Sequence, residues 1–96
     1  MIPGTTTKVS ESVLASAATI NPKTDVVRIT GSTQINTINP SFGGGFSGMV
    51  MLIPTDGAVT LGTSGNILVG LAMAQNRTVN LTYLKSTGKW YVENGV

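Results

Sequence analysis

Few residues of this chain could do acid–base or nucleophilic chemistry. It contains no histidine and no cysteine, the side chains that most often serve as general bases and nucleophiles. Its carboxylates, a pair of which could act as a glycosidase acid and base, are Glu11, Asp25, Asp56 and Glu93. The two aspartates stand in predicted turns, where Asp usually caps backbone groups, and nothing places two carboxylates in one cleft. We therefore predict that the protein is not an enzyme and has no catalytic residues.

The glycine-rich stretch F-G-G-G-F-S-G, which ends at Gly48, is the second candidate for chemistry. Gly43, Gly45 and Gly48 fit G-x-G-x-x-G, the pattern of a dinucleotide-binding turn. That turn needs a preceding strand, a following helix and an acidic residue about 20 positions further on. Here the glycines follow a proline-containing loop and lead into the apolar run 48–53, with no acid near residue 69. We predict a structural loop and no cofactor, and the absence of D-x-D spacing predicts no metal site.

Composition limits the partners of the chain. Charged residues make up 10% of its 96 residues, against roughly 25% in an ordinary domain, and the net charge is only +2. The basic residues are not clustered as they are in nucleic-acid-binding proteins. The longest apolar runs are also much shorter than the roughly 20 residues of a membrane-spanning helix. A domain this small is marginally stable unless disulfides, metals or partner subunits supplement its core. Self-association is the supplement that fits, and an unusually neutral monomer is the alternative.

Turn signals divide most of the chain into short strands. The predicted strands are 25–30, 34–39, 48–53, 58–61, 66–71, 77–84 and 89–93. This spacing, with Gly, Pro and Asn turns and no strand–helix–strand alternation, predicts an all-β fold, a small antiparallel β-sandwich or barrel. The run 48–53 is apolar throughout, as in a strand covered on both faces. Trp90 and Tyr83 are expected to anchor the core.

A change of composition near Pro22 predicts two parts: an extended N-terminal arm at residues 1–22 and a β-domain at residues 23–96. Val9, Val13 and Ala17 recur at a spacing of four, which is compatible with a short helix. An arm that orders only against a partner is the alternative, because Thr and Ser are poor helix formers.

Several strand and turn sequences resemble a module of virion structural proteins of tailed bacteriophages. They are DVVRITGSTQINTI at 25–38, FSGMVMLIP at 46–54, TLGTSGNI at 60–67 and LTYLKSTGKWY at 81–91. The module is similar to those of tail fibres, tailspikes and small head-decorating proteins. The resemblance implies β-structure and a homotrimer, and it carries over no catalytic residue.

One short arm and one module suit a capsid decoration, or cement, protein better than a fibre with a shaft. The resemblance thus implies a structural virion protein that binds the outer surface of a capsid as a homotrimer and stabilises the shell. Its partners would be copies of itself and the major capsid protein, with no nucleic acid and no membrane. The alternative is a receptor- or glycan-binding module of a tail or head fibre, with Trp90, Tyr91 and Asn94 as candidate contacts.

We expect the contacts with other subunits to come from apolar residues of the arm and from the two phenylalanines that flank the glycine loop. These residues are Ile2, Val9, Val13, Leu14, Ile20, Phe42 and Phe46. Exposed apolar and aromatic side chains are typical of protein interfaces. For each of them, packing within its own domain is the competing interpretation.

Overall fold

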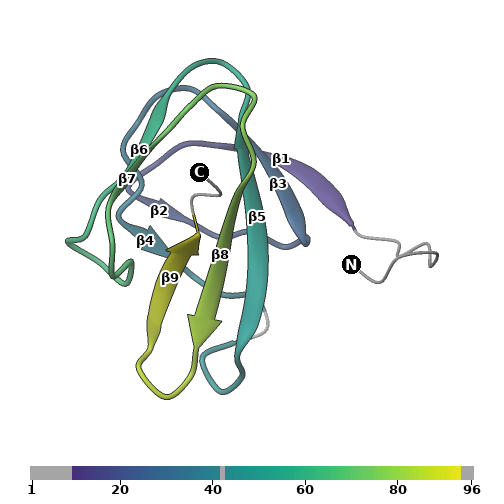
Figure 1. Ribbon diagram of the computed structural model, residues 1–96. Helices are drawn as coiled ribbons and strands as arrows, with labels where there is room; N and C mark the ends of the chain where they lie inside the picture. Colours follow the sequence, from purple (N-terminus) through teal and green to yellow (C-terminus); the bar gives the residue numbers. More distant parts are fainter. Residues whose placement is uncertain (1–9, 42, 94–96) are drawn as a thin grey trace.

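The computed structural model describes residues 10–41 and 43–93, and this part of the chain forms strands and no helix (Figure 1). The strands are β1 (Glu11–Ala15), β2 (Thr19–Ile20), β3 (Val26–Thr30), β4 (Thr37–Ile38), β5 (Gly48–Pro54), β6 (Val59–Leu61), β7 (Leu71–Met73), β8 (Val79–Leu84) and β9 (Lys89–Glu93). One layer is a five-stranded sheet in the order β1-β3-β5-β8-β9. The other contains two small sheets, β2-β4 and β6-β7. The predicted all-β fold is confirmed.

The first six strands alternate between the two layers, so the chain coils. β1, β3 and β5 are parallel neighbours, with Glu11 opposite Val26 and Val26 opposite Met51. β2 and β4 are parallel in the other layer, where Ile35 also forms a parallel bridge to Leu61 of β6. The sequence predicts antiparallel pairing, whereas β1, β3 and β5 pair in parallel, and so do β2 and β4. Parallel neighbours need a crossover, and here a short strand of the opposite layer serves as that crossover.

The coil stacks two copies of one tetrapeptide. T-I-N-P occurs at residues 19–22 and again at 37–40, and the two copies form β2, β4 and the corners that follow them. Each residue of β2 stands opposite its identical counterpart in β4. At the corners, Asn39 Nδ2 donates a hydrogen bond to Asn21 Oδ1 over 2.8 Å. The repeat therefore aligns successive turns of the coil in both backbone and side chains.

The rest of the chain closes the coil with antiparallel strands. β8 pairs with β5, β9 with β8, and β7 with β6. The predicted hairpin at the end of the chain is confirmed, and Gly88 in its turn has φ 67°, which glycine adopts without strain. The strand expected at 66–71 lies further along the chain, because β7 begins at Leu71 and Ile67 forms only a single bridge to Trp90.

The described part of the predicted arm belongs to the sheets. β1 pairs with β3 over its whole length, and β2 pairs with β4. The helix considered around Val13 and Ala17 is not formed, since Val13 lies in β1 and exposure alternates along that strand. Pairing with β3 supplies the backbone hydrogen bonds, whereas Ser and Thr would weaken a helix here.

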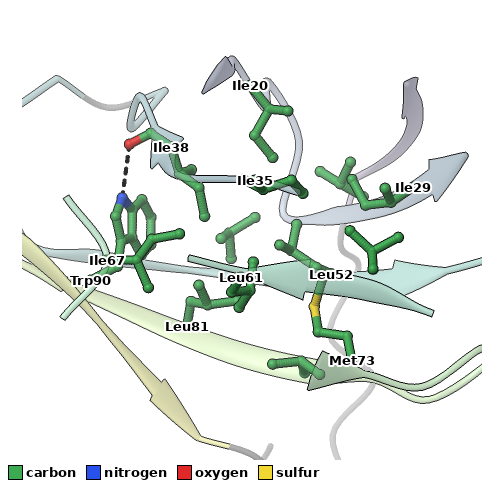
Figure 2. Close-up of a cluster of buried hydrophobic side chains, with 14 of the residues drawn as sticks. Ile20, Ile29, Ile35, Ile38, Leu52, Leu61, Ile67, Met73, Leu81 and Trp90 are labelled. Atoms are coloured by element: carbon green, nitrogen blue, oxygen red, sulfur yellow. Dashed lines mark hydrogen bonds between the residues drawn. The ribbon is translucent and has the colours of Figure 1, made fainter. Parts of the chain in front are cut away.

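Buried apolar side chains fill the space between the layers (Figure 2). Trp90 is fully buried, and its indole Nε1 donates a hydrogen bond of 2.8 Å to the carbonyl of Ile38. The rings of Trp90 and Tyr83 lie 5.2 Å apart, so the two aromatics predicted to anchor the core do so. The buried apolar residues are Ile20, Val27, Ile29, Ile35, Ile38, Val50, Leu52, Val59, Leu61, Ile67, Met73, Val79, Leu81, Tyr83 and Trp90.

The side chain of Asn66 takes the place of a strand beside β4. Its Oδ1 accepts a hydrogen bond from the N–H of Ile38 over 2.9 Å, and its Nδ2 donates to the carbonyl of Ile38 over 2.7 Å. The carbonyl of Asn66 itself accepts the N–H of Trp90 over 2.8 Å. One residue thus ties the second layer to β9 of the large sheet.

Candidate interaction surface

Glu11 and Asp25 lie near each other at the start of the neighbouring strands β1 and β3, whereas Asp56 and Glu93 lie elsewhere in the fold. Each makes a local contact: Glu11 with Arg28, Asp25 with Ser10, Asp56 with the backbone N–H of Gly31, and Glu93 with Asn80. Glu11 and Glu93 stand in one row on opposite edges of the large sheet. At about 4.8 Å per strand they are about 19 Å apart, well beyond the roughly 5–10 Å between paired glycosidase carboxylates.

Within residues 10–41 and 43–93, no three acidic, histidine or cysteine side chains come together as a metal ion would need. The same part of the chain contains no helix long and apolar enough to cross a membrane.

The glycine loop leads directly into β5, as its sequence predicted. Gly43 has φ 78°, a left-handed conformation that favours glycine. Phe46 near the end of the loop keeps 67% of its surface exposed, the largest fraction among the exposed apolar residues that the structure describes. The next residue, Ser47, is held to the far end of β8, since its hydroxyl accepts the N–H of Lys85 over 3.1 Å.

The seven predicted contact residues have different environments. Val13 on β1 and Phe46 are exposed, at 53% and 67%, and both are available to another chain. Leu14 is half-buried and packs against the core. Ile20 is 3% exposed and belongs to the core, so it is corrected to a residue of its own domain. The remaining predicted contacts, Ile2, Val9 and Phe42, lie outside the described residues.

The main candidate surface is the side of the five-stranded sheet that faces away from the second layer. Along β5 at its centre, Val50, Leu52 and Pro54 are buried, and the residues between them point outward. Met49 is 64% exposed, and Met51 and Ile53 are half-buried. The sequence predicted a strand covered on both faces, but in the part of the chain that the structure describes only the inner face is covered.

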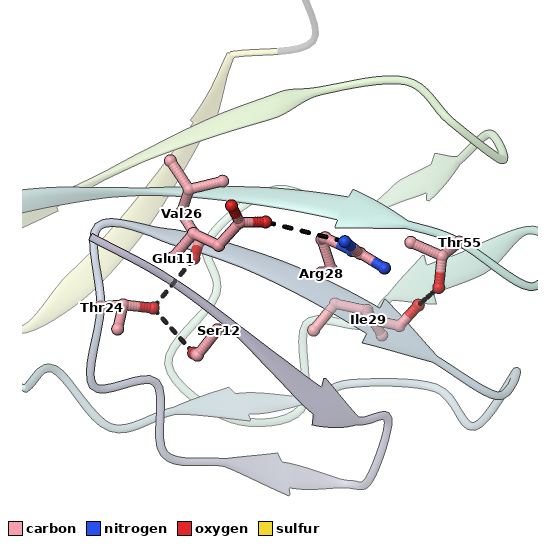
Figure 3. Close-up of polar contacts among 7 residues, drawn as sticks. All are labelled: Glu11, Ser12, Thr24, Val26, Arg28, Ile29 and Thr55. Atoms are coloured by element: carbon pink, nitrogen blue, oxygen red, sulfur yellow. Dashed lines mark hydrogen bonds and ion pairs between the residues drawn. The ribbon is translucent and has the colours of Figure 1, made fainter. Parts of the chain in front are cut away.

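The strand register places further residues beside this apolar row. We call the whole set the outer face: Glu11, Val13, Val26, Arg28, Met49, Met51, Ile53, Asn80, Thr82, Leu84, Tyr91 and Glu93. Glu11 and Glu93 lie on its two edge strands, whereas Arg28 lies on β3 opposite Ile53 and forms an ion pair of 3.7 Å with Glu11 (Figure 3). An apolar centre with polar residues around it is the usual anatomy of a protein interface.

A second surface feature is an open polar cleft at the two stacked T-I-N-P corners. Its lining residues are Asn21, Pro22, Lys23, Asn39, Pro40 and Ser41. Among the described lining residues of this cleft there is no aromatic platform of the kind that glycan sites use. Of the residues proposed for glycan contact, Trp90 is buried, Tyr91 lies on the outer face, and Asn94 is outside the described residues. Trp90 is therefore not exposed to a ligand.

Comparison with protein-family models, with curated proteins and with solved structures finds no match for this chain. The candidate surface rests on the geometry alone. Sequence reasoning missed it because an apolar run such as 48–53 does not say whether its second face is covered by the same chain or by another. The repeated T-I-N-P tetrapeptide was the signal that could have revealed the parallel coil.

Proposed function

We propose that this protein is a structural assembly protein that forms a homotrimer through its outer face. As a trimer it binds the outer surface of a tailed-bacteriophage capsid and stabilises the shell as a cement or decoration protein. It acts by binding alone, with no catalytic step. The observation that carries the proposal is the apolar row of the outer face: Met49, Met51 and Ile53 on the central strand.

Hydrophobic burial supplies the driving force for self-association. Met49 alone keeps 64% of its surface in water, and fully burying a side chain of its size gains about 1.5–3 kcal/mol. Arg28 and Glu11 already form an ion pair with each other, so this pair brings no unpaired charge into the interface. The outer face therefore gains free energy when another apolar surface covers it.

The outer face is small for a protein interface. Five strands at about 4.8 Å spacing and about 20 Å in length present about 400 Å² per protomer. Two such faces would bury about 800 Å², the size of many crystal contacts. The choice of three copies is therefore supported by the resemblance to trimeric virion modules and not by the area of this face.

The capsid as partner is supported by the resemblance of residues 25–91 to virion modules and by the low charge of the chain. Charged residues make up only 10% of it, so many copies can stand side by side on a shell with little mutual repulsion. A shell gains stability when a bound trimer adds interface area that joins neighbouring capsid subunits.

The test compares wild-type protein with Met49→Glu, and with Val69→Glu as the matched control. Val69 is 54% exposed in the segment between β6 and β7, outside the outer face, so the control adds the same charge at another exposed apolar site. We expect wild type and Val69→Glu to be trimeric in light scattering and to co-sediment with empty capsids built from the accompanying major capsid protein. Met49→Glu should not form the trimer and should lose most of its capsid binding. Equal behaviour of the two variants would contradict the proposed role of the outer face.

A further inference from the structure

β1 presents one complete set of backbone hydrogen-bonding groups away from the sheet. Two hydrogen bonds mark the ends of the ladder between β1 and β3. The carbonyl of Ser10 accepts the N–H of Val26, and the N–H of Ser16 donates to the carbonyl of Thr30. In a parallel pair, alternate residues direct their N–H and C=O groups to the same neighbour. The groups of Glu11, Val13 and Ala15 therefore point to the open edge, where no described residue pairs with them.

This edge is unusually easy for another strand to approach. The side chains of Glu11, Val13 and Ala15 are all exposed, and β1 is the end strand of the five-stranded sheet among the described residues. Proteins usually protect an edge with proline, a bulge or several charges. Glu11 is the one charged residue of β1, and its carboxylate already forms an ion pair with Arg28 on the neighbouring strand β3.

We propose that the edge of β1 pairs with β1 of a second copy, antiparallel, about a twofold axis at Val13. In this register Val13 stands opposite its twin, and Glu11 stands opposite Ala15 of the other copy. The three N–H and three C=O groups of each edge then form six hydrogen bonds between the two chains. The pairing also brings the two exposed Val13 side chains into contact and places no like charges opposite each other.

Other pairings of this edge are less favourable. Moving the twofold axis from Val13 to Glu11 would set the two Glu11 carboxylates opposite each other, and moving it to Ser12 would leave only four hydrogen bonds among the groups of Glu11, Val13 and Ala15. The opposite edge of the sheet, β9, is partly occupied, because Trp90 donates its N–H to Asn66 and accepts the N–H of Leu68. A head-to-tail contact between β1 and β9 would therefore find few free groups, which leaves the symmetric contact between two β1 strands.

The edge contact uses the backbone groups of β1, whereas the outer face is a side-chain surface of the whole sheet, and the two share Glu11 and Val13. It goes beyond the proposed function, and a trimer with three such edges would be linked to neighbouring trimers, as a coat on a shell requires. The two contacts can be separated by experiment, since Met49→Glu disrupts the outer face and lies two strands away from β1.

Single cysteines test the register, because the chain has no cysteine of its own. In a hydrogen-bonded antiparallel pair, opposite Cα atoms are about 5.5 Å apart, which matches disulfide geometry. Val13→Cys should therefore form a covalent dimer on mild oxidation. Glu11→Cys is the matched control, because its twin would be about 14 Å away, four residues along the strand. The double variant Glu11→Cys/Ala15→Cys should restore the crosslink.

The crosslinks are read on non-reducing gels, in wild-type and Met49→Glu backgrounds, with circular dichroism to verify the fold. The proposal predicts at least a tenfold excess of covalent dimer for Val13→Cys over Glu11→Cys, in both backgrounds. Equal crosslinking of the two would show random collision and overturn it. Folded Val13→Cys protein that stays monomeric would also overturn it, and would show that the edge is covered by another segment or partner. Loss of the crosslink only with Met49→Glu would show that it depends on the trimer.

Discussion

Replacing Asn66 by alanine should be among the most damaging single changes at a residue that is not in the core. The carboxamide of Asn66 holds both backbone groups of Ile38, at 2.9 and 2.7 Å, across 28 residues of sequence. Without it, the carbonyl of Ile38 keeps the indole N–H of Trp90 as a donor. The N–H of Ile38 loses its partner, and Ile38 is fully buried.

The expected loss follows from these contacts. One lost hydrogen bond costs about 1 kcal/mol, and a buried N–H left unsatisfied costs about 1–3 kcal/mol, so we expect about 2–4 kcal/mol in total. For a domain of this size, each kcal/mol lowers the melting temperature by about 4–8 °C, which predicts a fall of about 8–32 °C.

Urea unfolding followed by fluorescence measures this effect directly, because Trp90 is the single tryptophan and is buried in the folded state. Protein concentration must be held constant, since association raises apparent stability. Gln75→Ala is the matched control, because its exposed carboxamide donates to the carbonyl of Thr55 over 3.0 Å outside the outer face, and its loss should cost less than about 0.5 kcal/mol. If Asn66→Ala were no more destabilising than Gln75→Ala, the carboxamide of Asn66 would not be replacing a strand.

Other predictions concern packing at single positions. Gly65→Ala should destabilise the protein by about 1–3 kcal/mol in thermal unfolding, because the added Cβ would collide with the backbone of Asn36. Gly57→Ala is its control: nothing lies near the added Cβ and its φ is not left-handed, so melting should stay unchanged or rise slightly. Trp90→Phe should cost at least about 1 kcal/mol, because the hydrogen bond to Ile38 is lost. Circular dichroism follows that variant, and an unchanged midpoint would contradict the anchoring role.

The elements that depend on local pattern could be predicted from the sequence. Residues 89–93 were predicted as a strand and form β9 with the same bounds, and β5 and β8 differ from their predicted ranges by only one or two residues. Alternation, β-branched residues and turn glycines act over a few positions, so they are visible without tertiary information. The burial of Trp90 follows equally from its size.

The parallel coil and the contacts of Asn66 could not be predicted in the same way. Pairing of β1 with β3 and of β3 with β5 depends on the direction in which the chain returns, and short crossover strands such as β2 leave almost no periodic signal. Asn66 acts on Ile38 from a distant loop, and an asparagine that follows a glycine looks like any turn residue. The apolar run of β5 is visible in the sequence. That one of its faces is exposed depends on where the second layer lies, which the run itself does not indicate.

The mass of the wild-type protein in solution, measured by light scattering on a sizing column at several concentrations, is the most direct test of the central claim. The proposed trimer predicts a mass near three times 9.9 kDa at low concentration. Pairing of β1 edges would raise the mass further as the concentration increases. A mass of 9.9 kDa at every concentration would contradict the account, because the outer face would then remain stable in water without a partner.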